Sequence, residues 1–147
     1  MPATDLHHFA IKTQDVDATV DFWNSVVGSR SVDRPAFDFP GAWLQFGSTQ
    51  IHLYGGDAAL NGEGGHDLGT ACIDHVALSA EGFDEMRATF EKKGLEWRQQ
   101  DISSFGIWQL FVHDPNGVLV ELNFRSADEP KGSAGPDASN TYVPGTF

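Results

Sequence analysis

Histidine and glutamate occur at equivalent places in two similar stretches of this chain. His8 and His75 stand in the short apolar runs Leu-His-His-Phe-Ala-Ile and Ile-Asp-His-Val-Ala-Leu. Further along, Gln-Ile-His-Leu-Tyr aligns with Leu-Val-Glu-Leu-Asn, which places His52 at the position of Glu121. Three imidazoles and one carboxylate suit a divalent first-row metal (Fe, Mn, Ni, Co or Zn), whereas Ca and Mg prefer oxygen ligands throughout. The pattern therefore predicts a metal site formed by these four side chains.

Glu121 is the strongest single indication of that site. It interrupts an otherwise apolar run, Val-Leu-Val-Glu-Leu, at residues 118–122. Burying an unpaired carboxylate there would cost on the order of several kcal/mol, so a cation is the expected partner. A lone histidine in an apolar strand is usually a hydrogen-bonded core residue. Here a histidine occurs at the equivalent position of both modules, His8 and His75, and this repetition favours metal binding.

Each pair of candidate ligands lies in a module of the form βαβββ. In both modules, apolar residues at helical spacing stop at a glycine, Gly28 in the first and Gly94 in the second. Short strand-like runs precede and follow each helix. These runs are residues 6–11, 29–34, 42–46 and 50–54, and residues 73–78, 96–100, 107–112 and 118–124. The Asp-Pro-Asn-Gly sequence at residues 114–117 predicts a type I turn joining the last two strands.

The modules define the expected domain organisation. A single domain covers residues 1–124, with module one at 5–54, a glycine-rich connector at 55–70 and module two at 71–124. Residues 125–147 have no periodicity and are expected to form an extended or flexible C-terminal arm. The arm ends in Tyr-Val-Pro-Gly-Thr-Phe, which is more apolar than a solvated tail needs to be. We therefore expect this end to pack on a surface, such as that of a partner subunit.

Composition narrows the class of protein. The chain has 147 residues, with 9 lysine and arginine against 21 aspartate and glutamate residues, and a net charge of −12. This acidic balance argues against nucleic acid and anionic membranes as partners. Cys72 is the only cysteine, which excludes an intramolecular disulfide and a cysteine-rich zinc site and is typical of a cytoplasmic protein. Neither a signal peptide nor an apolar span of ~20 residues is visible.

The candidate residues also carry a family resemblance. Residues 6–11, 73–78 and above all 108–122 resemble the vicinal oxygen chelate superfamily, and the likeness covers about residues 5–124. The superfamily includes glyoxalase I, methylmalonyl-CoA epimerase, extradiol dioxygenases, fosfomycin-resistance proteins and bleomycin-binding proteins. The resemblance implies an α+β fold in which paired βαβββ modules form a cup-shaped, mostly antiparallel sheet around a metal. It transfers metal binding to three residues, His8, His75 and Glu121.

His52 departs from the pattern of the relatives. Glyoxalase I commonly has glutamate there and the epimerase glutamine, while the position is usually not a ligand in the extradiol and fosfomycin branches. As a fourth ligand, His52 would imply a glyoxalase-like lyase or isomerase that acts on a substrate with vicinal oxygens. Glu121 and His52 are then the expected proton-transfer residues. With His52 off the metal, two histidines and one carboxylate suit an Fe(II) extradiol-type dioxygenase that cleaves a catechol.

Other residues are expected to line the cup. Tyr54 and Gln50 share the strand face of His52, and Asn123 shares that of Glu121, so all three are predicted to bind substrate. Trp108 is either substrate-facing or part of the core. A third class of function is a metal-free drug-binding or resistance protein, whose acidic surface would suit a cationic ligand. A homodimer is expected, since related proteins often complete each cup with modules of different chains.

Overall fold

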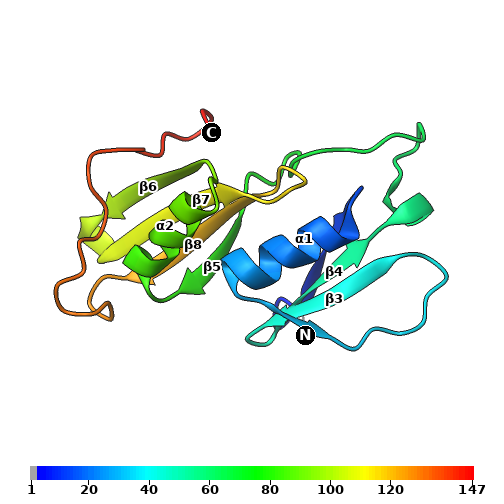
Figure 1. The fold of residues 1–147 in the computed structure, drawn as a ribbon, viewed down its shortest axis with the longest axis horizontal. Coiled ribbons are helices and arrows are strands. Elements are labelled where there is room, and N and C mark those ends of the chain that lie inside the picture. Colours follow the sequence, from blue (N-terminus) through cyan, green and yellow to red (C-terminus); the bar gives the residue numbers. More distant parts are fainter. Residues whose placement is uncertain (1–2) are drawn as a thin grey trace. The chain divides into compact units, whose positions relative to one another are not determined.

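The computed structural model describes residues 3–147, and the chain divides after Leu68 into two compact units (Figure 1). Unit 1 is Met1–Leu68 and unit 2 is Gly69–Phe147. Within the described residues, each unit has a four-stranded mixed sheet and one α-helix. The helices are α1, Val16–Phe22, and α2, Phe83–Lys92. Over residues 3–147, no helix combines the length and the apolar character that crossing a bilayer requires.

The sheet of unit 1 brings the first and last strands of its module together. Its strands are β1 His8–Lys12, β2 Arg30–Val32, β3 Gly41–Phe46 and β4 Thr49–Tyr54. They are ordered β1-β4-β3-β2, with β1 parallel to β4 and the other neighbours antiparallel. In this register His8 pairs with Gln50, and Ala10 pairs with His52.

Unit 2 repeats the same topology. Its strands are β5 Val76–Ala80, β6 Trp97–Ile102, β7 Ile107–His113 and β8 Leu119–Arg125. They are ordered β5-β8-β7-β6, and again only the pair formed by the first and last strands, β5 and β8, is parallel. The internal repeat and the α+β fold of two βαβββ modules are therefore confirmed. The strand expected at residues 73–78 is observed at Val76–Ala80. His75 therefore directly precedes β5.

The first helix differs from the regular α-helix that the spacing predicts. Asp15 caps α1 by accepting a hydrogen bond from the backbone N–H of Ala18 at 2.9 Å. After Phe22 the helix widens into a π-helical turn, Trp23–Val27, because the N–H groups of Gly28 and Ser29 both reach the carbonyl of Trp23 at 2.9 Å. Gly28 then ends the helix with a φ of 97°, as its position in the sequence predicts.

Alternation along the strands gives each sheet an apolar core face and a second face, called the polar face here because it carries the candidate ligands as well as some apolar side chains. In unit 2, Leu110, Leu122 and Phe124 are fully or almost fully buried, and Phe83 of α2 packs on Phe124 at a ring distance of 5.3 Å. Each such side chain stabilises the fold by about 1.5–3 kcal/mol when buried. The residues between them, including Glu121, face the opposite side of the sheet because successive strand residues alternate.

A tight turn fixes the register of the hairpin that carries Glu121. The N–H of Gly117 donates to the carbonyl of Asp114 at 3.0 Å, so residues 114–117 form the predicted turn. The Asp114 carboxylate also accepts hydrogen bonds from the backbone of Asn116 at 2.8 Å and of Val118 at 2.9 Å. With this register, Phe111 pairs with Glu121.

Candidate functional site

The polar face of unit 1 carries a column of stacked rings around His52. The His52 ring stacks on His8 at a centroid distance of 4.0 Å and on Trp43 at 4.1 Å, with an angle of only 1° between the latter two rings. His8 is exposed, whereas His52 is buried. Burial, with smaller contributions from the charges of His8 and His7, lowers the pKa of His52. His52 is therefore held as a neutral imidazole, the form that can bind a metal or accept a proton.

The ring nitrogens of this pair have different partners. His52 Nε2 donates to Gln50 Oε1 at 2.9 Å, because an amide oxygen can only accept. The Nδ1 atoms of His7 and His8 lie 2.8 Å apart, which leaves His8 Nε2 for another partner. His8 thus offers Nε2 as a ligand atom. His52 keeps its proton at Nε2 and offers Nδ1, either to a cation or as a proton acceptor.

Unit 2 holds the second pair of predicted ligands, His75 and Glu121. His75 Nε2 lies 3.0 Å from Glu121 Oε2, and His75 Nδ1 lies 2.7 Å from Asp74 Oδ1. The other carboxylate oxygen, Glu121 Oε1, accepts hydrogen bonds from Gln109 Nε2 and Asn123 Nδ2, both at 2.8 Å. Each ligand atom therefore has its orientation set by a neighbour on its far side, as is typical of metal-binding histidines and carboxylates.

The pair fits a divalent cation by distance and by charge. Two ligand atoms about 2.0–2.1 Å from one ion and at right angles to each other would lie about 3.0 Å apart, which matches the separation of His75 Nε2 and Glu121 Oε2. A His75 ring with its single proton at Nδ1, on the side of Asp74, would turn the lone pair of Nε2 toward the Glu121 carboxylate. Such a contact needs a proton or a cation to be favourable. Within residues 3–147, no group of three or more His, Cys, Asp or Glu side chains is assembled to hold a metal ion.

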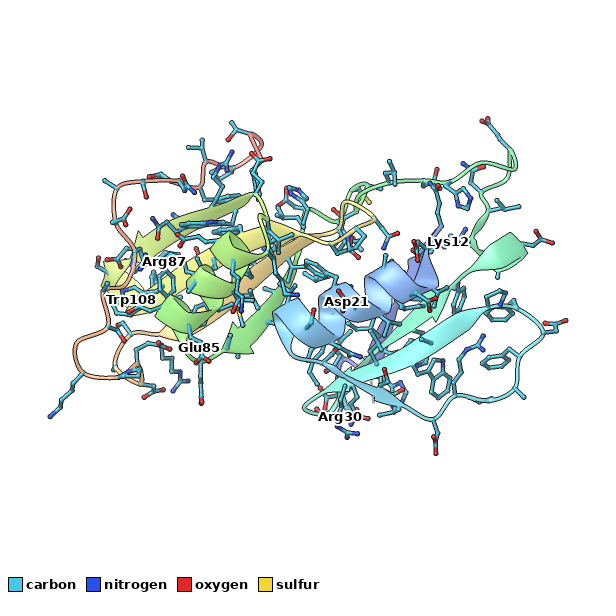
Figure 2. All side chains as sticks on the ribbon, in the orientation of Figure 1. Lys12, Asp21, Arg30, Glu85, Arg87 and Trp108 are labelled. Carbon is cyan, nitrogen blue, oxygen red and sulfur yellow. The ribbon has the colours of Figure 1, made fainter. Side chains whose placement is uncertain are left out.

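The predicted substrate-binding residues lie in different surroundings. Gln50 and Asn123 contact predicted ligands directly, as described above. Tyr54 shares the face of His52 and packs edge-on against Phe39 at a ring distance of 5.3 Å. Trp108, labelled in Figure 2, instead faces α2, where its ring lies 5.5 Å from that of Phe83. The strand register places Trp108 on the opposite side of the sheet from Glu121. The packing of Trp108 thus favours a position in the core over one that faces the substrate.

Two residues that contact the candidate ligands were not predicted from the sequence. Gln109 pairs with Asn123 across the hairpin and bonds both Asn123 and Glu121 at 2.8 Å. Counting back from Glu121 through the turn would have placed Gln109 on the same face. Asp74 stands next to His75 in the sequence, but nothing in the local pattern indicated that its carboxylate turns back to the His75 ring.

Asp74→Asn tests the orienting role of that carboxylate. Replacing the carboxylate with a neutral amide weakens the hydrogen bond that holds the His75 ring. We expect affinity for the metal to fall by about 10–100-fold, the usual cost of losing such a partner. Competition with a chromogenic chelator measures this affinity, and Asp101→Asn, an exposed position on β6, serves as the control. An Asp74→Asn protein that binds metal as tightly as the control would contradict the assignment.

The lowered pKa of His52 predicts a pH-dependent stability of the metal-free protein. The unfolded chain, with a histidine pKa near 6.5, binds a proton at His52 more readily than the folded chain does. Stability is therefore complete above about pH 6.5 and falls as the pH drops toward the lower folded pKa. The free energy of unfolding, measured with urea in EDTA between pH 5 and 7.5, should rise less steeply with pH for His52→Gln than for the wild type. His66→Gln, at an exposed connector position, should keep the wild-type slope; equal slopes for all three proteins would refute the prediction.

An aromatic surface extends from the His52 column in unit 1. The Phe37 ring lies 6.4 Å from Trp43, and Phe37 and Phe39 stack at 5.4 Å. The guanidinium of Arg34 lies 4.9 Å from the centroids of both phenylalanine rings and donates to the Phe39 carbonyl at 2.8 Å. Phe37 is 46% exposed, so part of this surface is open to a ligand.

Comparison with known proteins gives related sequences and folds. No family model matches the chain. The chain is 26% identical over 130 residues to "Glyoxylase I 4" of Arabidopsis thaliana, a match that covers 81% of this chain and 70% of the relative. Lactoylglutathione lyase from Agrobacterium tumefaciens has the same fold, with a TM-score of 0.64, 18% identity and coverage of 86% of this chain and 98% of that one. FosX, a fosfomycin resistance protein from Listeria monocytogenes, gives a TM-score of 0.65 with 15% identity, covering 84% and 94% of the two chains. The related sequence and the shared fold support the resemblance to the vicinal oxygen chelate superfamily.

Proposed function

We propose that this protein is a metal-dependent, glyoxalase-like lyase or isomerase that acts on a small substrate with two vicinal oxygens. The observation that supports this most directly is the contact between His75 and Glu121, two ligand atoms 3.0 Å apart. Asp74, Gln109 and Asn123 hold this pair from behind. A relative named as a glyoxalase and a neighbour named as a lactoylglutathione lyase favour this reaction class.

The proposed ligands of a divalent ion are His8 and His52 in unit 1 and His75 and Glu121 in unit 2. When bound, such an ion polarises a substrate carbonyl and stabilises the negative charge of an enolate oxygen. Fe, Mn, Ni, Co and Zn all suit this donor set. We further propose that the protein forms a homodimer.

The protein's own residues would bind the substrate and move its proton. Glu121 is a candidate proton acceptor, because two amide donors hold its Oε1 and its Oε2 lies on the side of His75. His52, whose pKa is lowered by burial, can take or return a proton at Nδ1, the ring nitrogen that is not bonded to Gln50. Gln50, Tyr54 and Asn123 would orient the substrate on the same two strand faces.

A second candidate function is Fe(II)-dependent extradiol cleavage of a catechol. With His52 off the metal, His8, His75 and Glu121 remain as the ligands of an Fe(II) ion. The aromatic surface formed by Trp43, Phe37 and Phe39 would suit a substrate ring. The glyoxalase-like reading remains the principal one because the named relatives favour it.

The metal content of the purified protein tests the shared basis of both functions. Protein prepared without added metal should contain a stoichiometric divalent ion, or gain thermal stability when Fe, Mn, Ni, Co or Zn is added. Protein that gains nothing from any of these metals would fit the metal-free binding class instead. The two reactions separate by assay: formation of lactoylglutathione from methylglyoxal and glutathione supports the lyase. Oxygen uptake with a panel of catechols, after anaerobic loading with Fe(II), would instead support the dioxygenase and contradict the lyase.

A further inference from the structure

The C-terminal arm, defined here as residues 126–147 because β8 extends to Arg125, is held on unit 2 by specific contacts. The Glu129 carboxylate accepts hydrogen bonds from the N–H groups of Gly82 at 3.0 Å and Phe83 at 2.8 Å, at the start of α2. Asp84 of α2 accepts from the N–H groups of Ala134 at 2.7 Å and Gly135 at 3.1 Å. These contacts tie the first half of the arm to the helix side of the sheet.

The arm then runs past β6, as its orange to red trace shows (Figure 1). The side chain of Gln99 on β6 donates to Asp137 at 2.8 Å, and Thr141 forms an isolated parallel bridge with Gln99. The backbone N–H of Gln99 donates to the Asn140 carbonyl at 2.8 Å, and the N–H of Tyr142 donates to the Gln99 carbonyl at 2.9 Å. The arm is therefore fixed at the edge of the sheet immediately before Tyr142.

Beyond this bridge, the side chains of the arm lie on the polar face of the sheet, which carries Glu121. The Tyr142 ring stacks on Phe111 at 3.7 Å with an angle of 8°, and the Phe147 ring lies 4.4 Å from that of His113. Phe111 is the direct cross-strand partner of Glu121. Tyr142 thus covers the residue beside the candidate ligand rather than the core under α2.

Tyr142 lies beside the candidate site through the contacts of its ring. The ring is buried with Phe111 and Leu119, and the side chain is 9% exposed overall. Burial, with smaller contributions from the negative charges of Asp74 and Glu121, raises the pKa of Tyr142. Within residues 3–147 the hydroxyl donates no hydrogen bond to the protein, and it is not among the fully enclosed polar atoms. It remains a protonated donor that a ligand can reach.

We propose that Tyr142 is a substrate-contacting residue, whose ring forms an apolar wall beside Glu121 and whose hydroxyl donates a hydrogen bond to a substrate oxygen. This inference rests on the proposed function of the Glu121 site. Under this proposal, the C-terminal arm contributes to the substrate specificity of the site. The preferred ligand would combine a hydrogen-bond-accepting oxygen with an apolar group that packs against Tyr142 and Leu119.

Tyr142→Phe keeps the stacked ring and removes only the hydroxyl. The probe is 4-nitrocatechol, which carries two vicinal oxygens and changes its absorption when it binds a metal. For the metal-loaded protein, we expect the Kd of this probe to rise roughly tenfold in Tyr142→Phe, as loss of one hydrogen bond implies. Metal affinity and the unfolding midpoint should stay at wild-type values. Thr141→Val, which removes a hydroxyl from the adjacent exposed residue, is the matched control and should bind the probe normally.

The outcomes separate the inference from the function on which it rests. If Tyr142→Phe binds the probe as tightly as the wild type, Tyr142 is only a packing residue and the inference is overturned while the metal site stands. If the wild type binds neither metal nor probe, the proposed function fails and this inference fails with it. If Tyr142→Leu lowers the unfolding midpoint but Tyr142→Phe changes nothing, the ring anchors the arm and the hydroxyl has no role at the site.

Discussion

Glu121→Gln is expected to abolish activity while leaving the fold intact. The glutamine oxygen can still accept the hydrogen bonds from Gln109 and Asn123 that Glu121 Oε1 accepts at 2.8 Å. The second oxygen, which faces His75 Nε2 at 3.0 Å, becomes an NH₂ group with no lone pair for a cation. Both a ligand and a candidate base are lost in one substitution. We expect kcat/KM to fall by about 10²–10⁴-fold or more, and metal affinity to fall further than in Asp74→Asn.

The measurement combines metal content, steady-state kinetics and thermal unfolding of the metal-free protein. Glu91→Gln, on the exposed surface of α2, removes the same charge away from the site and is the matched control. It should retain wild-type metal content and kinetics. A Glu121→Gln protein that keeps its metal and more than about a tenth of wild-type kcat/KM would contradict both metal-dependent functions.

Mixing two inactive variants should restore activity if modules of different chains form each site. His8→Ala damages unit 1 and Glu121→Gln damages unit 2. Each unit has its own sheet and core, and a glycine-rich connector joins them, so subunits can exchange modules without new folding. In an equal mixture half of the dimers are mixed, and one of the two sites in each mixed dimer is free of both substitutions. We expect about a quarter of wild-type activity.

The control for this experiment is a mixture of His8→Ala and His52→Ala, which both damage unit 1. No combination of these two chains contains an intact unit 1, so the mixture should stay inactive. If the first mixture also stays inactive while sedimentation shows dimers, each chain completes its own site. If sedimentation shows only monomers at micromolar concentration, the dimer itself is refuted.

Several features of the fold follow from local patterns. Gly28 ends the first helix with a positive φ, and residues 114–117 form the predicted turn, because each depends on a conformation that only a few neighbouring residues determine. The strand pairing β1-β4 and β5-β8 repeats because both modules have the same order of apolar runs. The π-helical turn at Trp23–Val27 was not predicted, since helical spacing alone does not distinguish it from an α-helix.

The sequence by itself determined which residues are the candidates for the chemistry and how they repeat between the two modules. The repeat aligned His8 with His75 and His52 with Glu121, and alternation placed Gln50 and Asn123 beside them. These results depend on periods of two residues along a strand, which are visible without coordinates.

Only the tertiary structure decided the surroundings of those residues. The contact of Asp74 with His75, the approach of Gln109 to Glu121 and the direction of Trp108 depend on register and rotamers. Tyr142 is the clearest case, because an arm with no periodicity reaches the face of Glu121 only through contacts with α2 and β6 that are distant in sequence. Such contacts are set by the packing of the whole unit, and no local pattern encodes them.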